Sequence, residues 1–174
     1  MKKTIFALCV LSFIAFSSVF SQDHNTTKAD FILDLFQKVE WPSEFAQDHS
    51  IYVIGDSPAV PVLEKKAAER SKNGKTISIK KISVDDDYAG CRILYLATDD
   101  LGQLAKVLKK VKGTSILTVS DVDGFARYGV MINVLEPSDQ SKEKVGLIIN
   151  KMTARDAGLK IDPKLIENAD KTFG

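Results

Sequence analysis

The chain has 174 residues, which suits one domain with a substantial hydrophobic core. Its hydrophobic content of 44% and its charged content of 27% are ordinary for a globular protein. The 24 basic residues nearly balance the 23 acidic ones. This balance argues against a nucleic-acid-binding protein, which needs a clustered basic surface.

Residues 1–21 have the pattern of a secretory signal peptide. Lys2 and Lys3 precede an apolar run, and small residues follow it. The apolar run is shorter than the roughly 20 residues that a membrane-spanning helix needs. We expect cleavage between Ser21 and Gln22, which predicts an exported mature protein.

The mature chain is predicted to begin with a short tail and a helix. Residues 22–27 are polar and are expected to be disordered, so that the folded domain spans 28–174. Thr27 can cap a helix over 27–40, in which apolar residues recur with helical spacing. The proline after Trp41 disfavours helix at that residue, so the helix should end there.

Strand and helix patterns alternate through the rest of the chain. Apolar, β-branched runs predict strands at 51–55, 76–82, 91–97, 115–119, 130–135 and 145–150. Helical spacing of apolar residues predicts helices at 58–70, from a cap at Thr98 or Asp99 to Gly113, at 153–157 and at 162–169. The order predicts a single α/β domain with a mainly parallel sheet flanked by helices and a C-terminal antiparallel hairpin at the sheet edge.

The sequence GDSP directly after the first of these strands allows two interpretations of Ser57. A serine hydrolase needs a base for its nucleophile, usually a histidine. After cleavage only His24 and His49 remain, and neither follows Ser57 in the chain. We therefore favour a helix start, with Asp56 or Ser57 as the cap and Pro58 in the first turn.

Polar residues follow two strands that are expected to be parallel. Asp56 and Ser57 follow one, and Ser120 and Asp121 follow the other. Ligands in open α/β sheets bind beyond the carboxyl ends of the strands. These four residues are thus candidates for the rim of a crevice that binds a small molecule.

Asp121 and Asp123 also resemble the start of a calcium loop. The following glycine comes too early for that loop, and the next acidic residue is Glu136. We expect no metal site, no cofactor and no catalytic residue in this chain.

Cys91 is the one cysteine that remains after signal cleavage. An internal disulfide is therefore excluded. A buried, unreactive thiol is one interpretation, since Cys91 opens the apolar run CRILYLA. A disulfide between two molecules is the other.

Five segments occur in the order found in a known family: KVEWP (38–42), YVIGDSP (52–58), CRILYLA (91–97), ILTVSDVDGFARYGVMINVL (116–135) and IINKMTARDAGLKIDPKLIENA (148–169). The chain resembles the YfiR family of exported bacterial proteins over nearly the whole mature sequence. Two departures stand out: Cys91 lacks the partner cysteine that some relatives carry, and Val130 follows Gly129 where a second glycine is expected.

The resemblance implies a periplasmic protein with a Rossmann-like fold and no enzymatic activity. It further implies a negative regulator that binds the periplasmic part of an inner-membrane diguanylate cyclase. An outer-membrane lipoprotein can sequester such a regulator and release the cyclase, which affects cyclic di-GMP signalling, biofilm formation and motility. A homodimer is also consistent with the family.

Three hypotheses on function follow. The first is a regulatory binding protein, with the aromatic residues Trp41, Phe125 and Tyr128 as candidate partner contacts. The second is a small-ligand binding protein that uses the crevice. The third is a hydrolase that uses Ser57.

Overall fold

The computed structural model describes residues 24–42, 49–72, 76–136 and 144–174. The expected signal peptide and its cleavage point between Ser21 and Gln22 lie outside the described residues. Residues 24–38 form a helix, so the disordered tail expected over 22–27 is wrong for residues 24–27. Thr27 lies inside this helix and is not its cap.

Strands and helices alternate through most of the chain, as the sequence predicts. The strands are β1 (Val39–Glu40), β2 (Ser50–Gly55), β3 (Ser78–Lys81), β4 (Ile93–Ala97), β5 (Leu117–Ser120), β6 (Ile132–Leu135), β7 (Gly146–Asn150), β8 (Lys160–Ile161) and β9 (Lys171–Phe173). Helices after the N-terminal one are α2 (Ala59–Ser71), α3 (Leu101–Val111), α4 (Phe125–Tyr128), α5 (Lys151–Asp156) and α6 (Pro163–Glu167).

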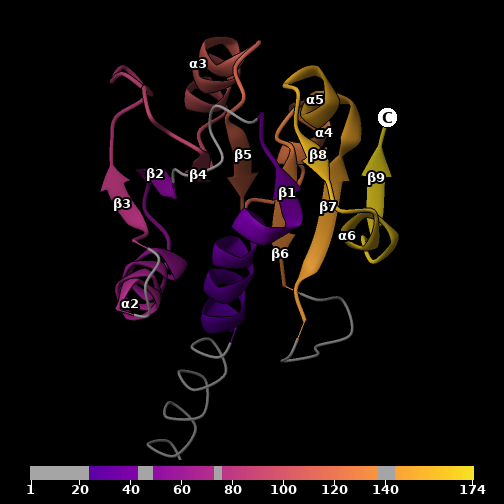
Figure 1. Cartoon of the computed structure of the whole chain (residues 1–174). Helices are drawn as coiled ribbons and strands as arrows, with labels where there is room; N and C mark the ends of the chain where they lie inside the picture. The colour runs from indigo at the N-terminus through magenta and orange to yellow at the C-terminus, as the bar shows by residue number, and fades with distance from the viewer. Residues whose placement is uncertain (1–23, 43–48, 73–75, 137–143) are drawn as a thin grey trace, which may run out of the picture.

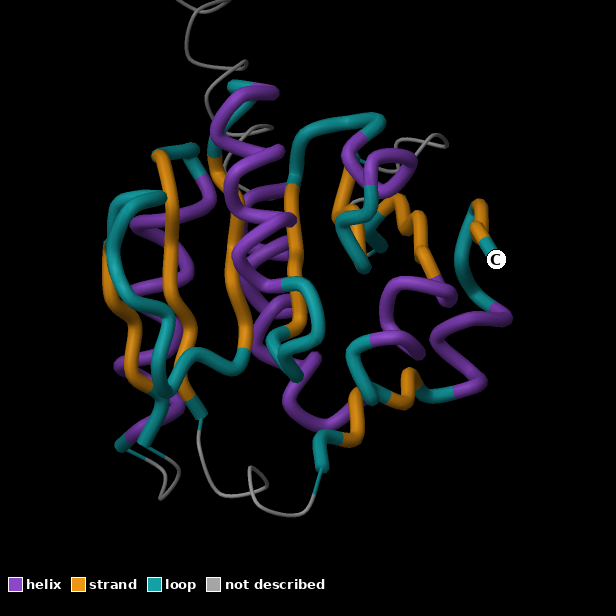
Figure 2. Tube along the Cα trace, turned by 90° about the horizontal axis from the view of Figure 1, so that it is seen from above, coloured by secondary structure: helices purple, strands orange, loops and turns teal. Residues whose placement is uncertain are grey.

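Seven of the described strands form one sheet in the order β3-β2-β4-β5-β6-β7-β9. Pairing is parallel from β3 through β6, and β6 and β7 form the predicted antiparallel hairpin. The predicted α/β fold with a mainly parallel sheet is confirmed. One strand of this sheet was missed: β9 pairs with β7 in parallel and lies outside the hairpin, at the outer edge of the molecule (Figures 1 and 2).

Helices cover both faces of this sheet. On one face the N-terminal helix and α2 bury apolar side chains such as Ile32 and Leu63 against the strands. On the other face α3 and α4 bury Leu104, Val107 and Phe125. Each face therefore has its own hydrophobic core, as expected for a doubly wound α/β domain.

A two-stranded sheet connects the N-terminal helix region to the C-terminal part of the chain. β1 pairs antiparallel with β8, so that Val39 lies opposite Ile161. The amide of Asp162 also donates a hydrogen bond to the carbonyl of Lys38, at 2.8 Å. The helix expected over 27–40 thus ends at residue 38, because residues 39–40 pair as a strand with the C-terminal part of the chain.

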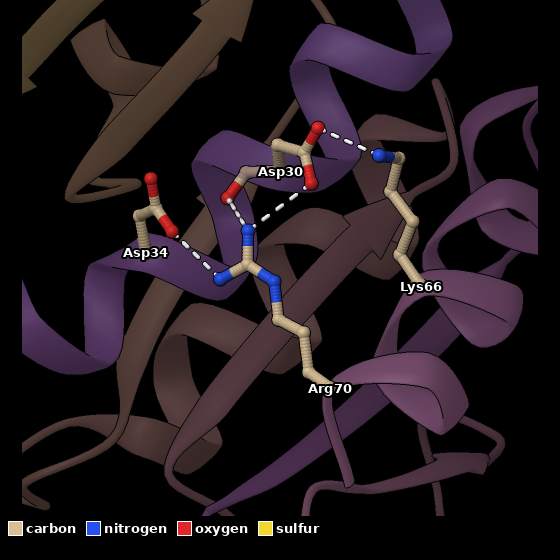
Figure 3. Close-up of polar contacts among 4 residues, drawn as sticks. All are labelled: Asp30, Asp34, Lys66 and Arg70. Carbon is tan, nitrogen blue, oxygen red and sulfur yellow. Dashed lines mark hydrogen bonds and ion pairs between the residues drawn. The ribbon is translucent and has the colours of Figure 1, made fainter. Parts of the chain in front are cut away.

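Charged side chains also join the N-terminal helix to α2 (Figure 3). The Lys66 ammonium lies 2.7 Å from the Asp30 carboxylate. The Arg70 guanidinium reaches Asp30 at 3.1 Å and Asp34 at 2.6 Å. On each helix the two charges are four residues apart and so lie on one face, which brings them opposite each other across the contact.

The cap of α3 differs from the prediction by one residue. Asp100, and not Thr98 or Asp99, is the N-cap, and its carboxylate accepts hydrogen bonds from the amides of Gly102 (2.7 Å) and Gln103 (3.0 Å). Three adjacent polar residues offer the same type of cap, and the sequence alone does not distinguish them.

Candidate functional site

A crevice of about 450 Å³ opens beyond the carboxyl ends of β2, β4 and β5. Nine residues line it: Gly55, Asp56, Ser57, Ala97, Thr98, Asp99, Gln103, Asp121 and Val122. Gly55 ends β2 with a φ of 87°, and a Cβ there would lie 2.3 Å from the carbonyl oxygen of Ala97. Only glycine allows the strand ends to approach so closely.

The crevice lies where the direction of the chain connections reverses. From β2 the chain passes through α2 to β3 on one side, and β4 lies on the other side of β2. α2 and α3 pack on opposite faces of the sheet. This is the topological switch point at which doubly wound folds bind their ligands.

Three of the four predicted crevice residues line this site: Asp56, Ser57 and Asp121. Ser120 does not, because it is fully buried. Its hydroxyl donates to the carbonyl of Leu96 at 2.8 Å and accepts from the amide of Val122 at 3.1 Å. Ser120 therefore shapes the loop that carries Asp121.

Ser57 does not cap α2. The N-cap is Pro58, without a side-chain hydrogen bond, and the backbone carbonyl of Ser57 accepts from the amide of Val60 at 3.0 Å. The Ser57 hydroxyl is instead hydrogen-bonded to the Tyr95 hydroxyl at 3.0 Å. Helix-cap statistics could not reveal this contact, since Tyr95 lies on the next strand of the sheet.

Tyr95 is a site residue that the sequence analysis missed. Its ring is fully buried. Burial raises the pKa of Tyr95 above its ordinary value, and the negative charge of Asp121 raises it further. The phenol therefore stays protonated, and its hydrogen bond with Ser57 holds that side chain at the crevice floor. The one signal in the sequence is a tyrosine in the middle of an apolar strand.

The surroundings of Ser57 do not favour a nucleophile. The group bonded to its hydroxyl is a phenol that holds its proton more strongly than usual, which makes it a poor general base. The His49 ring packs on Phe36, with ring centroids 4.8 Å apart. His24 lies in the first turn of the described N-terminal helix and is buried.

The charged groups of the crevice are carboxylates, on Asp56, Asp99 and Asp121. The Lys81 ammonium lies 3.6 Å from Asp56, and both side chains are more than half exposed. At the start of α3 the free amides that could bind phosphate are already bonded to Asp100. The crevice therefore suits a neutral or cationic polar molecule better than a nucleotide. Within the described residues, no cluster of side chains could hold a metal ion.

Two buried asparagines hold α4 in place beside this site. The Asn133 side chain accepts a hydrogen bond from the amide of Ala126 and donates to the carbonyls of Ser120 and Val122. The Asn150 side chain donates to the carbonyl of Ala126 at 2.9 Å and caps α5. The polar residues of the MIN and IIN segments thus connect the loop after β5 to β6 and β7.

The three aromatic candidates for partner contact lie in different environments. Phe125 is 3% exposed and belongs to the core, so a role as an exposed contact is wrong for this conformation. Trp41 is half-buried and packs beside Phe36, with ring centroids 6.0 Å apart. Tyr128 is 61% exposed and is accessible to a partner.

Cys91 is free and buried, with 1% of its surface exposed. Burial raises the pKa of its thiol to about 12, which keeps it protonated and unreactive. The structure thus agrees with the buried-thiol interpretation.

Among the described helices, none has the length and apolar character needed to cross a bilayer.

The comparison with solved structures gives two similar chains. One is a conserved domain protein from Vibrio cholerae O1 biovar El Tor, 15% identical, with a TM-score of 0.47 over 71% of this chain and 54% of that one. The other is an ABC domain in complex with L-Trp from Streptococcus pneumoniae, 11% identical, with a TM-score of 0.51 over 71% and 56%. Our chain spans about half the length of each, and the second likeness supports the fold alone.

Comparison with curated proteins gives no match. A family model described as YfiR/HmsC-like matches residues 25–170, which include the N-terminal helix, both cores, the crevice and the two asparagines that hold α4. This protein therefore belongs to the YfiR/HmsC-like family.

Proposed function

We propose that this protein is a periplasmic regulator that restrains an inner-membrane diguanylate cyclase by direct contact with its periplasmic part. The observation that carries the proposal is the family match over residues 25–170, which covers almost all of the described fold. The signal-peptide pattern of residues 1–21 supports export to the periplasm.

The mechanism would be a shift of population. A sensor that exchanges between an active and an inactive state is held inactive by a protein that binds the inactive state more tightly. Taking such a sensor from almost fully active to almost fully inactive requires roughly a 10⁴-fold difference in affinity. A rigid binding surface suits this task, because little ordering free energy is lost on contact.

An outer-membrane lipoprotein that binds the same regulator would release the cyclase by competition. Self-association into a homodimer would change the number of contact surfaces for each sensor. The lipoprotein and the second copy of this chain enter the proposal through the family alone. Among the three aromatic candidates for partner contact, Tyr128 is the one with a largely exposed side chain.

The test is the intracellular level of cyclic di-GMP in cells with and without the gene. We expect deletion to raise cyclic di-GMP and to increase biofilm formation, and the exported protein supplied from a plasmid to reverse both. An unchanged level after deletion would overturn regulation of a cyclase while leaving the fold and the family intact.

The crevice supports a second candidate function, the binding of a small polar molecule. Its position at the topological switch point favours this function, and so do the hydrogen-bonded Ser57 and the carboxylate of Asp121 in its lining. A ligand that binds only the folded state raises the melting temperature by mass action. We expect neutral or cationic metabolites, and not nucleotides, to do so. The shift should disappear in the Asp121→Asn variant and persist in Asp156→Asn, an exposed site on α5.

A further inference from the structure

Helix α3 carries apolar residues beside its buried stripe as well as within it. Leu104, Val107 and Val111 form the buried stripe. The second stripe consists of Leu101, Ala105 and Leu108, which are spaced by four and three residues and so lie on one side of the helix. Leu101 is 56% exposed and Ala105 is exposed, whereas Leu108 is half-buried and packs in part against the same core as the buried stripe.

The second stripe continues onto α4. A Cβ at Gly129 would lie 3.6 Å from the Cδ1 of Leu108, so the backbone after α4 packs directly on that leucine. Leu108 and Tyr128 line one groove of about 250 Å³, together with the buried side chains of Val111 and Met131. We call Leu101, Ala105, Leu108 and Tyr128 the α3–α4 strip.

The strip contains two of the three large hydrophobic side chains that are exposed in the described part of the chain, Leu101 and Tyr128. Single exposed apolar residues are ordinary, but a connected row beside a groove is typical of a protein-binding surface. The groove, with a volume of about 250 Å³ and a lining of both apolar and polar residues, has room for one anchor side chain of a partner.

The charged residues within α3 and at its C-cap are all basic, whereas the acidic residues Asp99 and Asp100 precede its first turn. The helix and its C-cap carry four exposed lysines and no acidic residue: Lys106, Lys109, Lys110 and Lys112. Lys110 is engaged with the carbonyls of Val84 and Asp86 and lies over the Tyr88 ring at 4.4 Å. Lys109 follows Leu108 directly, and Lys112 lines the groove itself. Asp156 of α5 also lines the groove, so the positive charge near the groove comes from the α3 side and not from α5 as well.

We propose that the α3–α4 strip is the docking surface for an amphipathic segment of a protein partner. Its apolar side chains would cover the strip and enter the groove, and its carboxylates would meet Lys109 and Lys112. A membrane is the less suitable occupant, because the wide apolar face of α3 is already buried on the sheet and the remaining strip is narrow. The identity of the partner as a cyclase rests on the proposed function, whereas the position of the surface does not.

The test is photo-crosslinking in living cells. The photoreactive residue p-benzoylphenylalanine replaces Ala105 in the full-length exported chain, and the matched control carries it at Glu64, an exposed position of α2 on the other face of the sheet. We expect a protein adduct at Ala105 and not at Glu64. Mass spectrometry of the adduct should identify a peptide that contains both apolar and acidic residues.

Charge reversal then tests the role of the lysines. Lys109→Glu with Lys112→Glu should reduce the Ala105 adduct about tenfold, because two attractive pairs become repulsive. The control, Lys65→Glu with Lys164→Glu, makes the same change of net charge at two exposed sites elsewhere and should leave the adduct unchanged. Leu101→Asp should also reduce it, and an unaltered melting temperature checks that each variant folds.

Three outcomes would overturn the inference: no adduct at Ala105, an adduct with a second copy of this chain, or an adduct with lipid. Cyclic di-GMP measured in the same strains separates this inference from the proposed function. An acidic protein adduct without any effect of gene deletion on cyclic di-GMP would support the docking surface and overturn the cyclase.

Discussion

At the scale of single residues, two asparagines account for part of the family sequence pattern. Asn133 is fully buried and satisfies one backbone amide and two backbone carbonyls in the segment that connects β5 to α4. Buried polar groups that lose their partners destabilise a fold by about 1–3 kcal/mol each. We therefore predict that Asn133→Ala lowers the free energy of unfolding by about 3 kcal/mol, measured by urea denaturation.

The control is Asn168→Ala. Asn168 donates to the carbonyl of Lys164 at an exposed position, where water can replace it. It should change the free energy of unfolding by less than about 0.5 kcal/mol. Equal effects of the two substitutions would contradict a special structural role for Asn133.

Cys91 gives a prediction on reactivity and pH. Its thiol has a folded-state pKa of about 12 against an ordinary value of 9.0. The contribution of this buried thiol to stability is therefore complete below pH 9, and it is lost as the pH rises from 9 toward 12, where only the unfolded chain releases the proton. At pH 8 the native protein should resist Ellman's reagent, and the urea-unfolded protein should react fully. Rapid reaction of the native protein would contradict the burial.

At the scale of elements, the N-cap of α3 is a position where the structure differs from the prediction made from the sequence. The Asp100 carboxylate accepts both hydrogen bonds of the N-cap. The neighbouring candidate Asp99 has an exposed side chain and makes neither of these bonds. Loss of an N-cap costs about 1 kcal/mol. We predict that Asp100→Ala lowers the melting temperature by a few degrees and that Asp99→Ala leaves it unchanged. The reverse order would show that the sequence prediction was right.

The contact between the N-terminal helix and α2 depends mainly on apolar packing, with ion pairs as a smaller term. The paired side chains are between 23% and 45% exposed, so water screens their attraction. Arg70→Met should lower the free energy of unfolding by about 1 kcal/mol at low salt and by less in 1 M NaCl. Lys160→Met, which removes the exposed pair with Glu40, should have no measurable effect. A loss from Arg70→Met that is unaffected by salt would contradict the electrostatic explanation.

At the scale of the whole molecule, periodicity predicted the alternation of elements and the parallel sheet. Periodicity failed to predict strands that are very short and whose partner strands lie far away in the sequence. β1 and β9 contain two and three residues, and each gains its strand conformation from a partner that local pattern does not reveal. The same reason applies to Ser57, whose hydroxyl partner lies 38 residues away.

The candidate site could be predicted in part for a physical reason. Carboxyl ends of parallel strands meet at one edge, which placed Asp56, Ser57 and Asp121 together. The inward direction of Ser120 and the burial of Phe125 depend on side-chain packing around α4, and apolar periodicity does not resolve packing in so short a helix. Tyr128 stays exposed because it lies at the end of that helix, followed by Gly129 with a φ of 117°.

The most direct test of the central claim compares two forms of the protein in the deletion strain: the full chain and a form without residues 2–21, which stays in the cytoplasm. Cyclic di-GMP is measured in both, at matched protein levels. Regulation by contact with the periplasmic part of a cyclase predicts that only the full chain lowers cyclic di-GMP to the level of the parent strain. An equal decrease with both forms, or no decrease with either, would contradict it.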